Sequence, residues 1–163
     1  MLKKVISGGQ TGADQAGLIA ARKFQLETGG WIPHGFRTED GPNWDLAKYD
    51  LIETTSSGYI KRTEYNVRDS DATVYFASNW KSPGTLCTLK AAKKLEKPAF
   101  RVDITIPSHH QDARGELFKD FLLHWNVETL NVAGHRESGH PGVTDYVVSY
   151  LSAVFQGLGL IEA

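Results

Sequence analysis

The sequence predicts an α/β fold with a mostly parallel sheet and helices on both faces. Short apolar runs alternate with amphipathic, helix-like segments along the whole chain, which is the order typical of parallel sheets. Glycine-rich polar stretches follow several of the apolar runs. The length of 163 residues and the hydrophobic content of 40% suit a single domain over residues 1–163 with one core.

The first part of the chain begins with a strand and a helix. The apolar run at residues 3–7 predicts the strand, and the spacing of apolar residues from Asp14 to Phe24 predicts the helix. A short strand is expected at residues 28–33. The polar residues 34–55 are expected to form a long loop, and long loops in compact domains are often functional.

The alternation continues to the end of the chain. Amphipathic spacing indicates the helices, and short apolar runs indicate the strands. In order, we expect a helix at 59–70, a strand at 72–78, a helix around 86–95, a strand at 99–104, a helix at 116–125, a strand at 128–134 and a last helix at 143–154.

Composition limits the partners and the compartment. The formal charge of −1 leaves no basic face for a nucleic acid polymer. No apolar run approaches the ~20 residues of a membrane span, and the N-terminal residues do not continue into an apolar signal segment. The single Cys87 cannot form an internal disulfide, and fits either a small core residue or a nucleophile near a helix N-terminus. We therefore expect a cytoplasmic protein without a membrane partner.

Four polar stretches each follow a predicted strand. They are GGQTGAD at 8–14, PHGFRTEDGP at 33–42, SNWKSPGT at 78–85 and AGHRESGHPG at 133–142. Because ligands of parallel sheets lie beyond the carboxyl ends of the strands, the fold would bring all four stretches to one site. The first and third stretches each open a helix, so two helix N-termini would converge, which suits a phosphate or another oxyanion. Four ordinary turns are the alternative interpretation.

Several of these motifs resemble a known family. SGGQTGAD, GGWIPHGFRTEDGP, RTEYNVRDSDATVYF, SPGT and NVAGHRES, in this order, are similar to the putative molybdenum carrier proteins. These form a circularly permuted, YpsA-like branch of the SLOG superfamily, which also contains the LOG phosphoribohydrolases. The resemblance implies a Rossmann-like, three-layer fold whose glycine turns bind a nucleotide or the molybdenum cofactor. It also implies a homo-oligomer, either a dimer or a tetramer.

The LOG enzymes resemble this sequence in a further feature. They have an arginine nine residues before an Asp-Ala that starts a strand, and Arg62 stands nine residues before Asp71. Their next motif, P-G-G-x-G-T-x-x-E, resembles SPGTLCT, which keeps Gly84 and Thr85 but places Thr88 where the catalytic glutamate is expected. A threonine cannot activate water as a carboxylate does. The comparison therefore implies binding without this catalysis, unless Asp14, Glu39 or Asp40 replaces the glutamate from another loop.

The histidines do not predict a metal site. There are six, of which His109 and His110 lie in a polar stretch and His135 and His140 are five residues apart. None of these spacings matches a zinc site. We expect no metal bound directly by the protein.

The sequence thus predicts a binding site for a phosphorylated or nucleotide-like ligand, with a carrier or sensor function ahead of catalysis. One alternative is a hydrolase of nucleoside 5′-monophosphates that uses Arg62 and a relocated carboxylate, with Asp14 the other catalytic candidate. A second is an oligomeric interaction module, which would bind no anion. The candidate ligand-binding residues are Gly8, Gly9, Gln10, Thr11, Gly12, Asp14, Arg37, Arg62, Asn66, Ser82, Gly84, Thr85, Arg136 and Ser138.

Overall fold

A computed structural model describes residues 1–107 and 112–163. Six strands form one parallel sheet in the order β5-β2-β1-β8-β6-β7, which confirms the predicted fold class. These strands are β1 (Lys4–Ser7), β2 (Glu27–Ile32), β5 (Leu51–Glu53), β6 (Ala72–Ala77), β7 (Ala99–Asp103) and β8 (Thr129–Gly134). The α-helices are α1 (Ala13–Lys23), α2 (Tyr59–Arg68), α3 (Pro83–Lys94), α4 (Asp112–His124) and α5 (Val143–Gly157).

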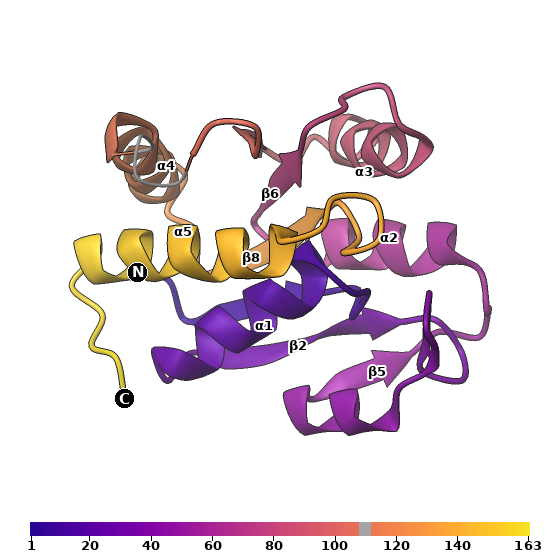
Figure 1. The fold of residues 1–163 in the computed structure, drawn as a ribbon. Coiled ribbons are helices and arrows are strands. Elements are labelled where there is room, and N and C mark those ends of the chain that lie inside the picture. The colour runs from indigo at the N-terminus through magenta and orange to yellow at the C-terminus, as the bar shows by residue number, and fades with distance from the viewer. Residues whose placement is uncertain (108–111) are drawn as a thin grey trace.

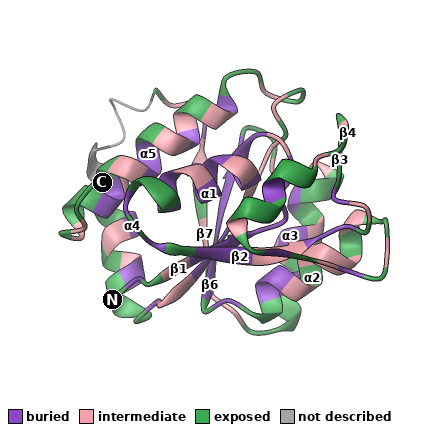
Figure 2. Cartoon of the chain, turned by 90° about the horizontal axis from the view of Figure 1, so that it is seen from below, coloured by how far each residue is buried: buried purple, intermediate pink, exposed green. Residues whose placement is uncertain are grey.

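The helices cover both faces of the sheet, so the fold has three layers and is Rossmann-like (Figures 1 and 2). Helix α5 packs against α1 and α4 on one face, and α2 packs against α3 on the other. Buried residues line the inner side of each helix and fill the central strands (Figure 2). All six residues of β6 are buried, as expected for a strand covered on both faces.

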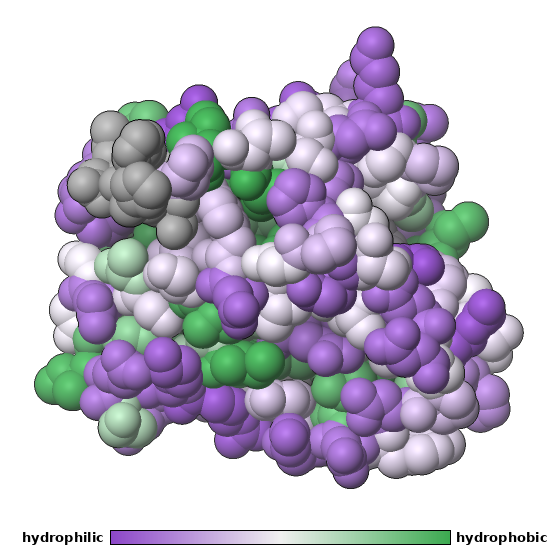
Figure 3. All heavy atoms as spheres, in the orientation of Figure 1, coloured by the Kyte–Doolittle hydropathy of each residue, from purple (hydrophilic) through white to green (hydrophobic). Residues whose placement is uncertain are grey.

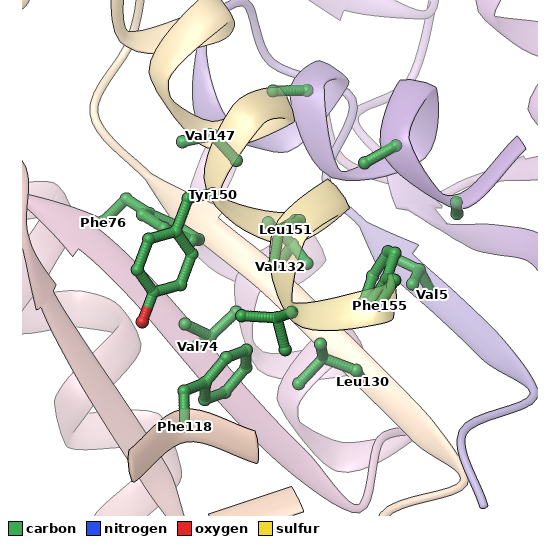
Figure 4. Close-up of a cluster of buried hydrophobic side chains, with 14 of the residues drawn as sticks. Val5, Val74, Phe76, Phe118, Leu130, Val132, Val147, Tyr150, Leu151 and Phe155 are labelled. Carbon is green, nitrogen blue, oxygen red and sulfur yellow. The ribbon is translucent and has the colours of Figure 1, made fainter. Parts of the chain in front are cut away.

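Aromatic rings link three elements in the larger core (Figure 4). Tyr150 of α5 contacts Phe76 of β6, with ring centroids 5.4 Å apart, and Phe118 of α4, with centroids 6.2 Å apart. Val147 and Leu151 of α5 are fully buried in the same cluster. Burial of a side chain of this size contributes about 1.5–3 kcal/mol to the stability of the fold, so these contacts hold α5 against the sheet.

The polar segment 34–55 differs from the long loop that was expected. It contains a hairpin of β3 (Arg37–Thr38) and β4 (Gly41–Pro42), a 3-10 helix η1 (Trp44–Tyr49), and β5. Strand β5 extends the sheet beside β2, with Leu51 opposite Gly30. A strand of three residues is too short to show a period of two in its sequence. Its pairing with β2 and the packing of Leu51 against Ile32 and Leu46 form only in the folded chain.

At the centre of the sheet, the first strand of the chain lies beside the last one. Strand β8 lies between β1 and β6, with Ser7 opposite Val132 and Phe76 opposite Gly134. The loops that follow β1, β6 and β8 therefore meet at one edge, where parallel sheets bind ligands. In Figure 1 the orange loop after β8 reaches toward α2, whereas both chain ends lie at the opposite side of the molecule.

The surface on the α1 and α5 side is mixed. Apolar side chains form small separate groups among hydrophilic ones on this face (Figure 3). Within residues 1–107 and 112–163, no helix has the length and hydrophobicity needed to cross a bilayer.

Candidate ligand-binding site

A pocket of about 650 Å³ lies beyond the carboxyl ends of β1, β6 and β8. This volume falls in the usual range for small-molecule sites, roughly 300–1,000 Å³. Its walls come from the loops after β1, β6 and β8, from helices α1, α2 and α3, and from strands β6 and β8. The lining residues are Gly8, Gln10, Asp14, Tyr59, Ile60, Arg62, Thr63, Asn66, Tyr75, Ser78, Asn79, Ser82, Pro83, Gly84, Cys87, Thr88, Asn131, Ala133, Gly134, His135, Arg136, Ser138 and Gly139.

The N-terminus of α3 forms one wall. Ser82 is the N-cap, and its hydroxyl accepts a hydrogen bond from the Thr85 amide at 3.4 Å, while Pro83 opens the helix. Gly84 is exposed, and a Cβ atom there would meet only the Tyr75 hydroxyl, 3.7 Å away. Pro83 has no N–H, and the amides of Thr85 and Leu86 donate to Ser82, so this wall offers an anion the Gly84 amide and the positive end of the helix dipole.

The N-terminus of α1 is more enclosed. The Ala13 amide donates to the His135 carbonyl at 3.1 Å, and a Cβ atom on Gly12 would lie 2.3 Å from that same oxygen. A Cβ atom on Gly9 would lie 2.7 Å from Ile32. Gly9, Thr11 and Gly12 thus pack against neighbouring segments, and only Gly8, Gln10 and Asp14 of this turn line the pocket.

Asp14 and Arg62 form a buried ion pair beneath the pocket. Their side chains are 3% and 13% exposed, with Arg62 Nη1 2.5 Å from Asp14 Oδ2. The same carboxylate accepts the Gln10 amide at 3.2 Å. Burial raises the pKa of Asp14, and the Arg62 guanidinium opposes this effect. Gly8 leaves room for the pair, because a Cβ atom there would lie 1.5 Å from Arg62 Nη1.

Three guanidinium groups surround the ring of Tyr59, the first residue of α2. Arg136 Cζ lies 4.7 Å from the ring centroid, Arg37 Cζ 5.2 Å and Arg62 Cζ 5.6 Å. Arg37 does not line the pocket, and its Nη1 donates to the Ser57 carbonyl at 3.0 Å. Tyr59 and these three arginines, together called the Tyr59 cluster, therefore extend from the pocket wall to its rim.

Glu39, at the tip of the β3–β4 hairpin, ties two site loops together. Its carboxylate accepts hydrogen bonds from the Thr11 hydroxyl and from the Ser138 hydroxyl and amide. Partial burial acts to raise the pKa of Glu39, but the bonds from Ser138 and Thr11 outweigh it and lower the pKa. Gln10 Oε1 accepts the Glu39 amide at 2.8 Å, whereas its Nε2 is buried and finds no partner within the described part of the chain.

Two further candidates serve the framework. Asn66 lines the pocket, but its amide group bonds the backbone N–H and C=O of Trp31 at 2.8 and 2.9 Å, which fixes α2 to β2. Thr85 is buried, and its hydroxyl donates to the Asn79 carbonyl at 3.1 Å. Thr85 does not line the pocket.

Several pocket residues were not among the candidates from the sequence, and three of them carry rings with polar atoms: Tyr59, Tyr75 and His135. Tyr59 and Tyr75 lie at positions where no local pattern distinguishes a site residue from a core residue, and burial raises the pKa of Tyr75 to about 12. From the sequence, His135 was expected to have a surface or loop-packing role rather than to bind a metal. Its Nε2 accepts the amides of Ser78 and Asn79 at 3.1 and 3.2 Å, and burial lowers its pKa, so the ring is held neutral.

Comparison with known proteins identifies the family. The model of the circularly permutated YpsA SLOG family matches residues 5–155. The chain belongs to this family. It is also similar to the crystal structure of a "Putative molybdenum carrier protein" from Syntrophus aciditrophicus SB, with 34% sequence identity, a TM-score of 0.86 and 94% of each chain covered. None of the curated proteins matches the chain. The family inferred from the motifs is confirmed.

The pocket of this SLOG family member contains little that could act as a general base. Among the described residues that line it, Asp14 is the sole carboxylate, and Arg62 already pairs with it. Thr88 is buried, with its hydroxyl 3.3 Å from the Gly84 carbonyl, and neither Glu39 nor Asp40 lines the pocket. No relocated carboxylate therefore stands free in the pocket.

The described residues contain no group of three side chains suited to hold a metal ion. His109 and His110 lie outside the described residues. His135 has its Nε2 engaged by two backbone amides, as above, and so does not offer this atom to a metal.

Proposed function

We propose that this protein binds a phosphorylated, nucleotide-like ligand and acts as a carrier or sensor, with the molybdenum cofactor or a nucleotide as the cargo. The proposal rests above all on one observation: Gly84 opens the first turn of α3 to a pocket that also contains Arg62 and Arg136. The anionic group of the ligand would lie at this turn, where the Gly84 amide can donate a hydrogen bond and the positive end of the α3 dipole favours negative charge. Membership of the family and similarity to the carrier-named protein support the choice of cargo.

A carrier fits the chemistry of the pocket better than a hydrolase does. Hydrolysis of an N-glycosidic bond needs a carboxylate to stabilise the developing charge or to activate water. Thr88 cannot do either, and Asp14 is committed to Arg62 at 2.5 Å. The proposal includes a cytoplasmic location, where nucleotides are made and used, and a homo-oligomer, which light scattering of the purified protein would measure.

Substitution of Gly84 tests the anion position. Gly84→Val should reduce the affinity for AMP, measured by calorimetry, by a hundredfold or more, because the new side chain would occupy the space at the first turn of α3. Gly115→Val is the matched control, since Gly115 also lies in the first turn of a helix and a Cβ atom there meets only Val154, at 3.8 Å. Native mass spectrometry of the freshly purified protein should in parallel detect a phosphorylated compound. Unchanged AMP affinity in Gly84→Val would refute the assigned anion position.

Turnover separates the carrier from the hydrolase. We expect the purified protein to release no free base from AMP above the rate without protein, measured by chromatography. Steady release that disappears in Asp14→Asn would establish the hydrolase instead, because asparagine keeps the shape of the side chain but cannot act as a base. Binding of no anion at all would favour the interaction module.

A further inference from the structure

The three arginines around Tyr59 carry more positive charge than one phosphate at α3 would use. We propose that the ligand has two phosphate groups, the second of which is held by the guanidinium groups of Arg136 and Arg37 at the Tyr59 ring. The ligand class is then a nucleotide-like bisphosphate or diphosphate. This inference rests on the proposed function and narrows it.

The charges in the cluster are unequally compensated. Arg62 is neutralised by Asp14, whereas within residues 1–107 and 112–163 neither Arg37 nor Arg136 forms an ion pair. Glu39 is close enough to Arg136 for electrostatic attraction, but its oxygens are taken by Thr11 and Ser138. The guanidinium groups of Arg37 and Arg136, 5.2 and 4.7 Å from the Tyr59 ring centroid, repel each other, and a dianion between them would remove this repulsion.

The geometry leaves hydrogen-bond donors available. A guanidinium group that lies over an aromatic ring keeps its N–H groups around its edge, where a phosphate can accept two at once. Arg37 uses one of its five donors, on Ser57, and the described part of the chain shows no side-chain hydrogen bond from Arg136. Arg62 Nε is buried and has no hydrogen-bond partner among the residues that the structure describes.

The cluster and the α3 turn are separate features of one cavity. Arg37 comes from the β3–β4 hairpin, Tyr59 from α2 and Arg136 from the loop after β8, and none of these belongs to α3. Tyr59 and Arg136 line the same pocket as Gly84, so one ligand can reach both positions. Because Arg37 lies outside the lining, the second phosphate would sit at the rim.

Calorimetry with AMP, ADP and adenosine 3′,5′-bisphosphate tests the inference in low-salt buffer. At least one of the two-phosphate compounds should bind tenfold or more tightly than AMP, and which one does so shows whether the phosphates are adjacent or apart. In the Arg37→Gln/Arg136→Gln variant this affinity ratio should fall towards one. In Gly84→Val all affinities should fall while the ratio remains. Both arginines are exposed, so their replacement leaves the core intact.

Arg22→Gln is the matched control. Arg22 is also exposed and lies over a tyrosine ring, 6.0 Å from the centroid of Tyr49, but it is not part of the pocket. Its substitution should leave the affinity ratio unchanged. If AMP binds and a second phosphate adds nothing, or if the gain survives in the double variant, the inference is wrong and the proposed function stands. If none of the three nucleotides binds and native mass spectrometry of the purified protein detects no phosphorylated compound, the proposed function fails and the inference fails with it.

Discussion

The Arg62 side chain shows how a single residue can serve both the fold and the site. The sequence predicts that Arg62 faces the ligand and serves binding and not folding, the alternatives being a solvated side chain or a pair with Glu64 or Asp69. In the structure Arg68 pairs with Asp69, and Arg62 reaches across to Asp14, 48 residues earlier. No local pattern in the sequence contains this pairing, because it depends on how α2 lies over the turn after β1.

Loss of the buried pair should destabilise the protein strongly. Arg62→Ala leaves the Asp14 carboxylate buried without its cation, so we expect the free energy of unfolding in urea to fall by about 3–5 kcal/mol. Arg68→Ala, on the same helix, removes an exposed pair and should cost about 0–1 kcal/mol. If Arg62→Ala loses no more stability than Arg68→Ala, the buried pair does not stabilise the fold. The Arg62→Lys variant keeps the charge, so its ligand affinity tests the role of Arg62 in binding separately from its role in stability.

His135 makes the loop before α3 sensitive to pH. Its neutral Nε2 accepts the amides of Ser78 and Asn79, and burial lowers its pKa below the ordinary 6.5, with His140 adding to the effect. A lowered folded pKa means that this contribution to stability is complete above pH 6.5 and is lost as the pH falls below it. His135→Gln keeps an acceptor that does not titrate. Between pH 7 and pH 5 the variant should therefore lose less stability than the wild type; an equal loss would contradict this.

At the scale of elements, the start of α5 depends on a side chain from the preceding loop. Gly142 is the N-cap and provides no side-chain bond, but the Glu137 carboxylate accepts the amides of Gly142 and Thr144 and the Thr144 hydroxyl, at 2.6, 3.0 and 2.6 Å. These contacts fix the loop that carries Arg136. Hydrogen bonds from Thr144, above all, lower the pKa of Glu137.

Removal of this capping charge should weaken α5. We expect Glu137→Gln to reduce the free energy of unfolding by about 1 kcal/mol at pH 7, the usual value of an N-cap interaction. Because the folded pKa is lowered, the contribution is present above pH 4.5 and is lost as the pH falls below it. The difference between variant and wild type should thus shrink in acid, measured by urea unfolding at pH 7 and pH 3. A difference that stays constant would mean that the charge has no part in the cap.

At the scale of the whole molecule, periodicity predicted the sheet, the helices and the loops at its carboxyl edge, because each depends on residues close in sequence. Three of the four polar stretches line the pocket, with Gly84 and Arg136 among the lining residues, and the fourth contacts two of them through Glu39. The Tyr59 cluster was not predictable, since it joins residues 37, 59 and 136 through the fold alone. Strand β5 was missed because three residues carry too little pattern.

The central position of β8 also affects how the chain can be made. A ribosome releases residues 129–134 after every other strand, so the growing polypeptide holds two unjoined sheets, β5-β2-β1 and β6-β7, with the facing edges of β1 and β6 open. Open strand edges can pair with other chains. Until β8 is made, chaperones or rapid completion of the chain must protect these edges. A ligand of the proposed pocket could not assist at this stage, because the residues that line the pocket lie on both sides of the gap. Under the proposed function, loading would therefore follow the completion of synthesis.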